Sequence, residues 1–213
     1  MTSRRKWALV PGFVAIALAA VALSAYSGAS SSQGFAPVQP VQFPHARHVT
    51  DLGMNCLYCH YSASQSPDPG LPAVGTCMGC HTLIGPQRPA MNGLPARTST
   101  EIKKLQQYAP IGQPEKWKPI EWVRIHKVPE YVHFPHMRHV NAGVTCQTCH
   151  GPVQTFTGPV YQYASLNMGW CVNCHVNGYK LGDGLRAAGV TPTPQQDAEP
   201  AKKARYDCAV CHY

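Results

Sequence analysis

The chain has 213 residues, and only 13% of them are charged, yet its formal net charge is +8. Its 20 prolines and 18 glycines predict short elements joined by many turns, rather than a large aliphatic core. Lysine and arginine are scattered along the chain without a run of four. This patterning argues against nucleic acid as a partner.

An uncharged stretch covers residues 7–26 and directly follows three basic residues at positions 4–6. At about 1.5 Å per residue, a helix of this length spans about 30 Å, the hydrocarbon thickness of a bilayer. We expect a cytoplasmic stub at residues 1–6 and a transmembrane anchor at residues 7–26, with the rest on the periplasmic or extracytoplasmic side of the cell membrane. The alternative is a cleaved signal peptide, because small residues near the end of the stretch offer a cleavage site.

All ten cysteines lie in one repeated pentapeptide, CxxCH, which occurs five times. This pattern is the attachment signature of c-type haem, in which two thiols form thioethers to the porphyrin and the adjoining imidazole is the proximal iron ligand. Disulfides and zinc ribbons, the alternatives, place no demand on the residue after the second cysteine. We therefore predict five covalently bound c-type haems. The cysteines are Cys56 and Cys59, Cys77 and Cys80, Cys146 and Cys149, Cys171 and Cys174, Cys208 and Cys211; the proximal histidines are His60, His81, His150, His175 and His212.

Six histidines lie outside these motifs, enough for one distal ligand on each iron. Four of them belong to a repeated segment, Phe-Pro-His-x-Arg-His-Val, which holds His45 and His48 before the first motif and His136 and His139 before the third. Two histidines three positions apart lie on one side of a helical turn, so they can serve two neighbouring irons. The repeat predicts two related two-haem units, with a fifth haem added to the second unit.

The distal ligand of the fifth haem must come from the remaining residues. His133 aligns with Gln42 of the first repeat, so the repeat does not require it as a ligand, and we interpret it as a loop histidine. His126 is then the expected distal ligand of the His212 haem. Met168, shortly before the fourth motif, is the alternative, because a thioether can replace an imidazole on haem iron. Core packing is the commoner use of a methionine side chain.

The motif spacing also predicts how the exported part of the chain is divided. We expect a linker at residues 27–40, a two-haem module at residues 41–90, a linker with a short helix at residues 91–118 and a three-haem module at residues 119–213.

The predicted fold is mostly irregular and α-helical, with short helices and loops wrapped around five c haems, one N-terminal transmembrane helix and nearly no strand. Each CxxCH should lie on a helical turn. Thr98-Ser-Thr-Glu101 is a capping-box pattern that predicts a solvated linker helix over residues 102–108. Pro200 is placed to start another helix, over residues 201–212.

The stretch from Trp122 to His175 resembles the pentahaem cytochrome c subunit of alternative complex III, a membrane quinol oxidoreductase. The resemblance rests on Trp-Val-Arg-Ile-His, Pro-Glu-Tyr, Phe-x-His-x-x-His-Val-Asn and Met-Gly-Trp-Cys-x-x-Cys-His. In the wider multihaem cytochrome c family, the first histidine of Phe-x-His-x-x-His binds the haem of the next motif and the second binds the haem after that. The resemblance therefore implies four pairs: His45 with His60, His48 with His81, His136 with His150, and His139 with His175.

The same resemblance implies an electron-transfer subunit with no catalytic site of its own. Its expected partners are an iron–sulfur subunit and polytopic quinol-binding subunits of the same complex, together with a monohaem cytochrome or soluble carrier as acceptor. The alternative is a stand-alone, membrane-anchored quinol dehydrogenase that feeds a periplasmic reductase. The predicted span contains no Asp, Glu, His or Lys to accept a quinol proton, which favours a partner for the quinol chemistry. We interpret the positive charge as compensation for the haem propionates.

Overall fold

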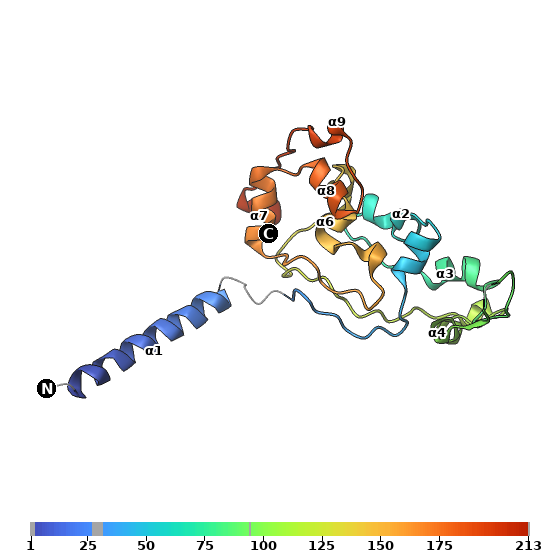
Figure 1. Cartoon of the computed structure of the whole chain (residues 1–213), viewed down its shortest axis with the longest axis horizontal. Coiled ribbons are helices and arrows are strands. Elements are labelled where there is room, and N and C mark those ends of the chain that lie inside the picture. The colour runs from blue at the N-terminus through green and yellow to red at the C-terminus, as the bar shows by residue number, and fades with distance from the viewer. Residues whose placement is uncertain (1–2, 27–31, 94, 213) are drawn as a thin grey trace.

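The computed structural model describes residues 3–26, 32–93 and 95–212. Figure 1 shows one long helix, α1, Ser3–Tyr26, and a head built from short helices and loops. The anchor predicted at residues 7–26 falls within α1, although its side chains are described only for residues 10–23. Across the described residues, no helix combines the length and the apolar character that a bilayer crossing requires.

Every CxxCH motif lies on a helical turn, as predicted. Asparagine caps two of these turns: the side chain of Asn55 accepts the N–H of Leu57, and that of Asn167 accepts the N–H of Trp170. The motif helices are α2, Cys56–Cys59; α3, Val74–His81; α6, Cys146–His150; α7, Met168–Asn177; and α10, Cys208–Cys211.

The two histidine pairs also lie on or at the start of helical turns, each leading into a motif helix. The first pair belongs to a π-helical turn, η1, Ala46–Asp51, whose N-cap is His45. The second pair lies on the α-helix α5, His136–Asn141. Short 3-10 turns follow motifs one and three: η2, Tyr61–Ser64, and η4, Val153–Thr155.

The helix predicted over residues 102–108 is α4, Thr100–Tyr108, and it starts earlier than expected. Its N-cap is Ser99 rather than Thr98, because the Ser99 hydroxyl accepts the N–H of Ile102 at 3.2 Å. The interpretation of α4 as a solvated linker helix is wrong: Leu105 is 5% exposed and packs with Met78 of α3. Partly buried hydrophobic side chains that pack against this cluster come from Val74, Cys77, Trp117 and Ile120.

Extended structure is sparse in the described residues, as the sequence predicts. Strands β1, Gln87–Arg88, and β2, Arg97–Thr98, form an antiparallel pair before α4. The 3-10 turn η3, Pro114–Lys116, follows α4.

The helix predicted over residues 201–212 is wrong, apart from the motif turn α10. Tyr179 and Lys202 exchange both backbone hydrogen bonds, at 3.0 and 2.9 Å, so the chain after Pro200 is extended along the end of α7. This long-range pairing satisfies backbone groups that a local helix would otherwise have satisfied.

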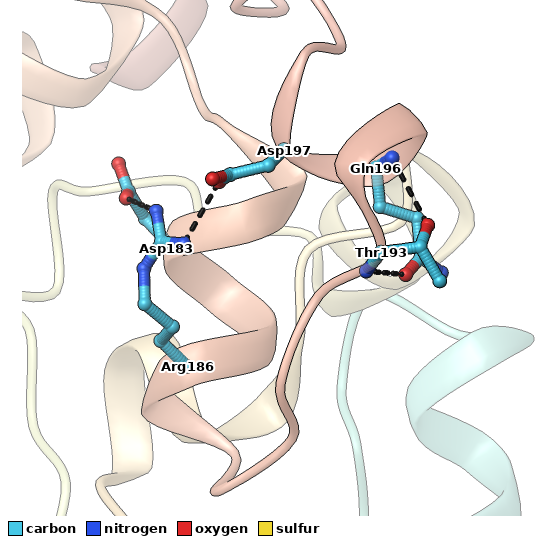
Figure 2. A network of polar contacts seen from close by, with 5 residues as sticks. All are labelled: Asp183, Arg186, Thr193, Gln196 and Asp197. Atoms are coloured by element: carbon cyan, nitrogen blue, oxygen red, sulfur yellow. Dashed lines mark hydrogen bonds and ion pairs between the residues drawn. The ribbon is translucent and has the colours of Figure 1, made fainter.

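Two short helices that were not predicted precede this segment: α8, Leu181–Ala187, and α9, Pro194–Asp197. Figure 2 shows the ion pair that joins them: Arg186 of α8 binds Asp197 of α9 at 2.8 Å, and it also binds Asp183 of its own helix at 2.7 Å. Thr193 and Gln196 form a reciprocal capping box at the start of α9. The Thr-x-x-Gln pattern was the available sequence signal for α9.

Replacing Leu105 with alanine should test the α3–α4 cluster. We expect a loss of about 2–5 kcal/mol in the free energy of unfolding of the haem-loaded protein, because a buried side chain leaves a cavity in a small core. The matched control is Ile111→Ala, since Ile111 is 49% exposed and should cost less than about 0.5 kcal/mol. Denaturant unfolding measures both, and equal losses would contradict the cluster's role.

Candidate haem centres

The ten cysteines are all free thiols in the structure, and each pair lies on one helical turn. In a helix, residues three positions apart share a face, so both sulfurs of a pair can reach the edge of one porphyrin. The histidine after each pair leaves the same turn, which is the geometry required for a proximal iron ligand.

Backbone carbonyls fix the orientation of five of the histidine rings. A carbonyl oxygen only accepts, so a ring nitrogen bonded to it carries the proton, and the other nitrogen, Nε2, keeps its lone pair for a metal. The repeat reproduces this bond: Nδ1 of His48 donates to Pro44 O and Nδ1 of His139 donates to Pro135 O, both at 3.1 Å. The other three bonds join His81 to Ile84 O at 2.9 Å, His136 to Pro67 O at 3.4 Å and His175 to Arg205 O at 2.6 Å.

Three of the four histidine pairs that the resemblance implies lie at the spacing of two axial ligands. With metal–imidazole bonds of about 2.0 Å, and ring nitrogens about 1.2 Å from their ring centroids, two imidazoles on opposite sides of one iron have centroids about 6.4 Å apart. The observed centroid distances are 6.3 Å for His48 and His81, 6.5 Å for His136 and His150, and 6.1 Å for His139 and His175. The separation in each pair therefore matches that of two imidazoles on one iron.

The fourth pair, His45 and His60, is close enough to interact electrostatically. Burial, followed by the nearby rings of His60 and His48, lowers the pKa of His45 to about 4. Burial, followed by His126 and His136, lowers the pKa of His150 to about 3. These imidazoles are neutral at physiological pH, and the neutral form is the one that binds a metal.

One phenylalanine in each repeat contacts both histidine rings of that repeat. Phe43 stacks on His48 with centroids 4.3 Å apart and meets His45 edge-on at 4.7 Å. Phe134 repeats both contacts, stacking on His139 at 4.4 Å and meeting His136 edge-on at 4.8 Å. Stacked and edge-to-face contacts of this kind restrict ring rotation. The Phe of Phe-Pro-His-x-Arg-His is thus a positioning residue for two histidines at once.

The predicted partners for the fifth motif are not brought together. The ring of His126 lies 4.3 Å from that of His150 in the third motif, a separation too short for an iron between the two rings. Its Nε2 is buried without a hydrogen-bond partner. Met168, the alternative ligand, begins α7 and is 67% exposed.

A segment next to His133 lies on the fifth motif instead. Val132 forms an isolated antiparallel bridge with His212, and the backbone N–H of His133 donates to Cys211 O at 2.8 Å. The ring of Tyr131 lies 5.6 Å from that of His212. Sequence spacing gives no signal for this contact, because it joins segments far apart in the chain.

Replacing Phe134 with leucine should loosen the distal rings of His136 and His139 while leaving both histidines in place. We expect altered g-values for two low-spin ferric haems in the electron paramagnetic resonance spectrum, because the angle between axial imidazole planes sets the g anisotropy. Phe35→Leu is the matched control, since Phe35 lies outside the repeat. An unchanged Phe134→Leu spectrum would show that the phenylalanine does not orient the ligands.

Comparisons with known proteins find similarity to multihaem cytochromes c. Residues 132–213 match the family of cytochrome c7 and related cytochrome c. Over 165 residues the chain is 27% identical to the multiheme cytochrome c subunit of menaquinone reductase from Nitratidesulfovibrio vulgaris, a match that covers 68% of this chain and 70% of the relative. Residues 132–213 are thus cytochrome c7-like, and the chain is similar to the multiheme cytochrome c subunit of that reductase, as its five CxxCH motifs predict.

Proposed function

We propose that the chain relays electrons along five covalently bound c-type haems and has no catalytic site of its own. The observation that carries this proposal is the axial spacing of three histidine pairs, at 6.1–6.5 Å between centroids. An iron with two imidazole ligands has no open position for a substrate, whereas it changes little on gaining or losing an electron. Bound c-type haem supplies this one-electron chemistry.

The chain's own residues then act as ligands and as supports for ligands. The proximal ligands are the histidines of the motifs. The proposed distal ligands are His45 for the first haem, His48 for the second, His136 for the third and His139 for the fourth. The two phenylalanines hold all four distal rings, and backbone carbonyls on Nδ1 hold three of them, those of His48, His136 and His139. These contacts limit reorganisation when the charge on the iron changes.

For the fifth haem we propose His133 as the distal ligand in place of His126. Support comes from the position of residues 131–133 at Cys211 and His212, and from the placement of His126 beside His150. His133 follows Val132, the residue that bridges to His212.

Paired alanine variants distinguish the two histidines. His133→Ala should convert one haem from low-spin to high-spin ferric iron, because the fifth iron loses its sixth ligand. His126→Ala should leave the number of low-spin haems unchanged. Electron paramagnetic resonance of the oxidised, full-length protein measures both. A high-spin signal from His126→Ala alone would return the assignment to His126.

We further propose that the chain is a subunit of a membrane-bound, quinone-linked respiratory complex. The similarity to the menaquinone reductase subunit supports a quinone-linked complex, and the sequence resemblance to the alternative complex III subunit supports a quinol-oxidising one. In either kind of complex, this chain would exchange electrons with a partner subunit that binds the quinone. The proposed partners are an iron–sulfur subunit, polytopic quinone-binding subunits and a monohaem cytochrome or soluble carrier. Residues 7–26 are proposed as the anchor, with the haem-binding part on the periplasmic side.

Gentle extraction from native membranes tests the complex. A high-salt wash should leave the full-length chain in the membrane, and mild detergent should release it together with an iron–sulfur protein and a polytopic subunit. Mass spectrometry of the co-migrating bands identifies the partners. Release by salt as a shorter chain would mean a cleaved signal peptide, and co-migration with only a periplasmic reductase would favour the stand-alone quinol dehydrogenase.

A further inference from the structure

The two repeats pack on each other through equivalent segments. α5, which leads into motif three, lies against the turn that follows motif one: the N–H of His136 donates to Pro67 O at 3.1 Å, and Asn141 Nδ2 donates to Ser64 O at 3.1 Å. In return, η1, which leads into motif one, lies against η4, the turn that follows motif three. Mutual contact of this kind, in which each copy uses the same two surfaces, is the mark of a two-fold relation.

Near a two-fold axis, equivalent residues meet each other, and the first cysteines of motifs one and three do so. The side chains of Cys56 and Cys146 are close enough to interact. The proximal histidines His60 and His150 are also close enough to interact electrostatically. Motifs one and three are therefore direct neighbours, although motif two lies between them in the sequence.

The remaining motifs extend outward from this centre. On one side, Cys59 of motif one interacts electrostatically with Cys77 and Cys80 of motif two. On the other side, Cys149 of motif three interacts in the same way with Cys171 and with Cys174 of motif four.

The fifth motif continues the second direction. Cys171 of motif four interacts electrostatically with Cys211. The carbonyls of His175 and Arg205 hold the two motifs together, since His175 O accepts from Ala204 N at 3.2 Å and Arg205 O accepts from His175 Nδ1 at 2.6 Å. Figure 1 shows α3, α2, α6 and α7 following one another across the head, with the C-terminus beside α7.

From these contacts we propose that the haems form one unbranched row in the order two, one, three, four, five, numbered by motif. This inference rests on the proposed set of five haems. The ends of the row are the haem at Cys77 and Cys80 and the haem at Cys208 and Cys211, so electrons enter at one of these and leave at the other. A chain that followed its sequence order would instead start at the first motif.

Nuclear magnetic resonance of the reduced, full-length protein in detergent tests the order, because Overhauser effects between haem substituents report adjacent haems. Two matched ligand variants mark one haem in each repeat: His48→Met marks haem two, and His139→Met marks haem four. We expect Overhauser contacts from haem two to haem one alone, and from haem four to haems three and five.

Contacts between haems two and three, or none between haems one and three, would overturn the order. Intact mass measured on the same sample counts the attached haems. A count of five with the wrong contacts overturns the order alone, whereas a lower count overturns the proposed five-haem relay and the row with it.

Discussion

The structure depends on one interaction, the pairing of histidine rings that come from separate segments of the chain. Few described side chains are buried: the buried hydrophobic residues are Val41, Met78, Leu105, Ala109, Ala164 and Tyr179. A core this small does not hold a chain of this length together unless other contacts contribute. The histidine pairs that we propose as iron ligands would be such contacts, because binding a metal stabilises whatever arrangement brings its ligands together.

The two Phe-Pro-His-x-Arg-His segments show how one short sequence positions such rings twice. Phe43 and Phe134 make the same stacked and edge-on contacts, and the rings of His48 and His139 make the same bond to a proline carbonyl four residues earlier. The turns that carry them differ, since η1 is a π-helix and α5 is an α-helix. The same side-chain contacts therefore occur on two different backbone conformations. This indicates that the positions of the rings matter more than the type of helix.

The sequence predicts the local helical turns of this chain well. The five helical motif turns and the two histidine turns follow from spacings of three or four residues, which a helix satisfies by itself. The tail differs because Lys202 pairs with Tyr179, and the site at the fifth motif differs because Val132 pairs with His212. Neither pairing has a local signature. The sequence also does not predict that α4 is buried against Met78. A nine-residue amphipathic helix shows the same sequence pattern whether its apolar face is exposed or packs on another helix.

The connection between α3 and α5 has to be long enough to run back across the head. If haem two ends the row and haem three lies at its centre, the chain after α3 must return past haem one before it begins the second unit. It turns back at α4, whose Leu105 is packed on α3, and on its return Val123 pairs with Gln39 through two hydrogen bonds of 2.9 Å. Shortening this connection would pull the two-fold contact apart, so deletions there carry a cost that deletions in an ordinary surface loop do not. Two similar units packed in this way thus also require a return path between them.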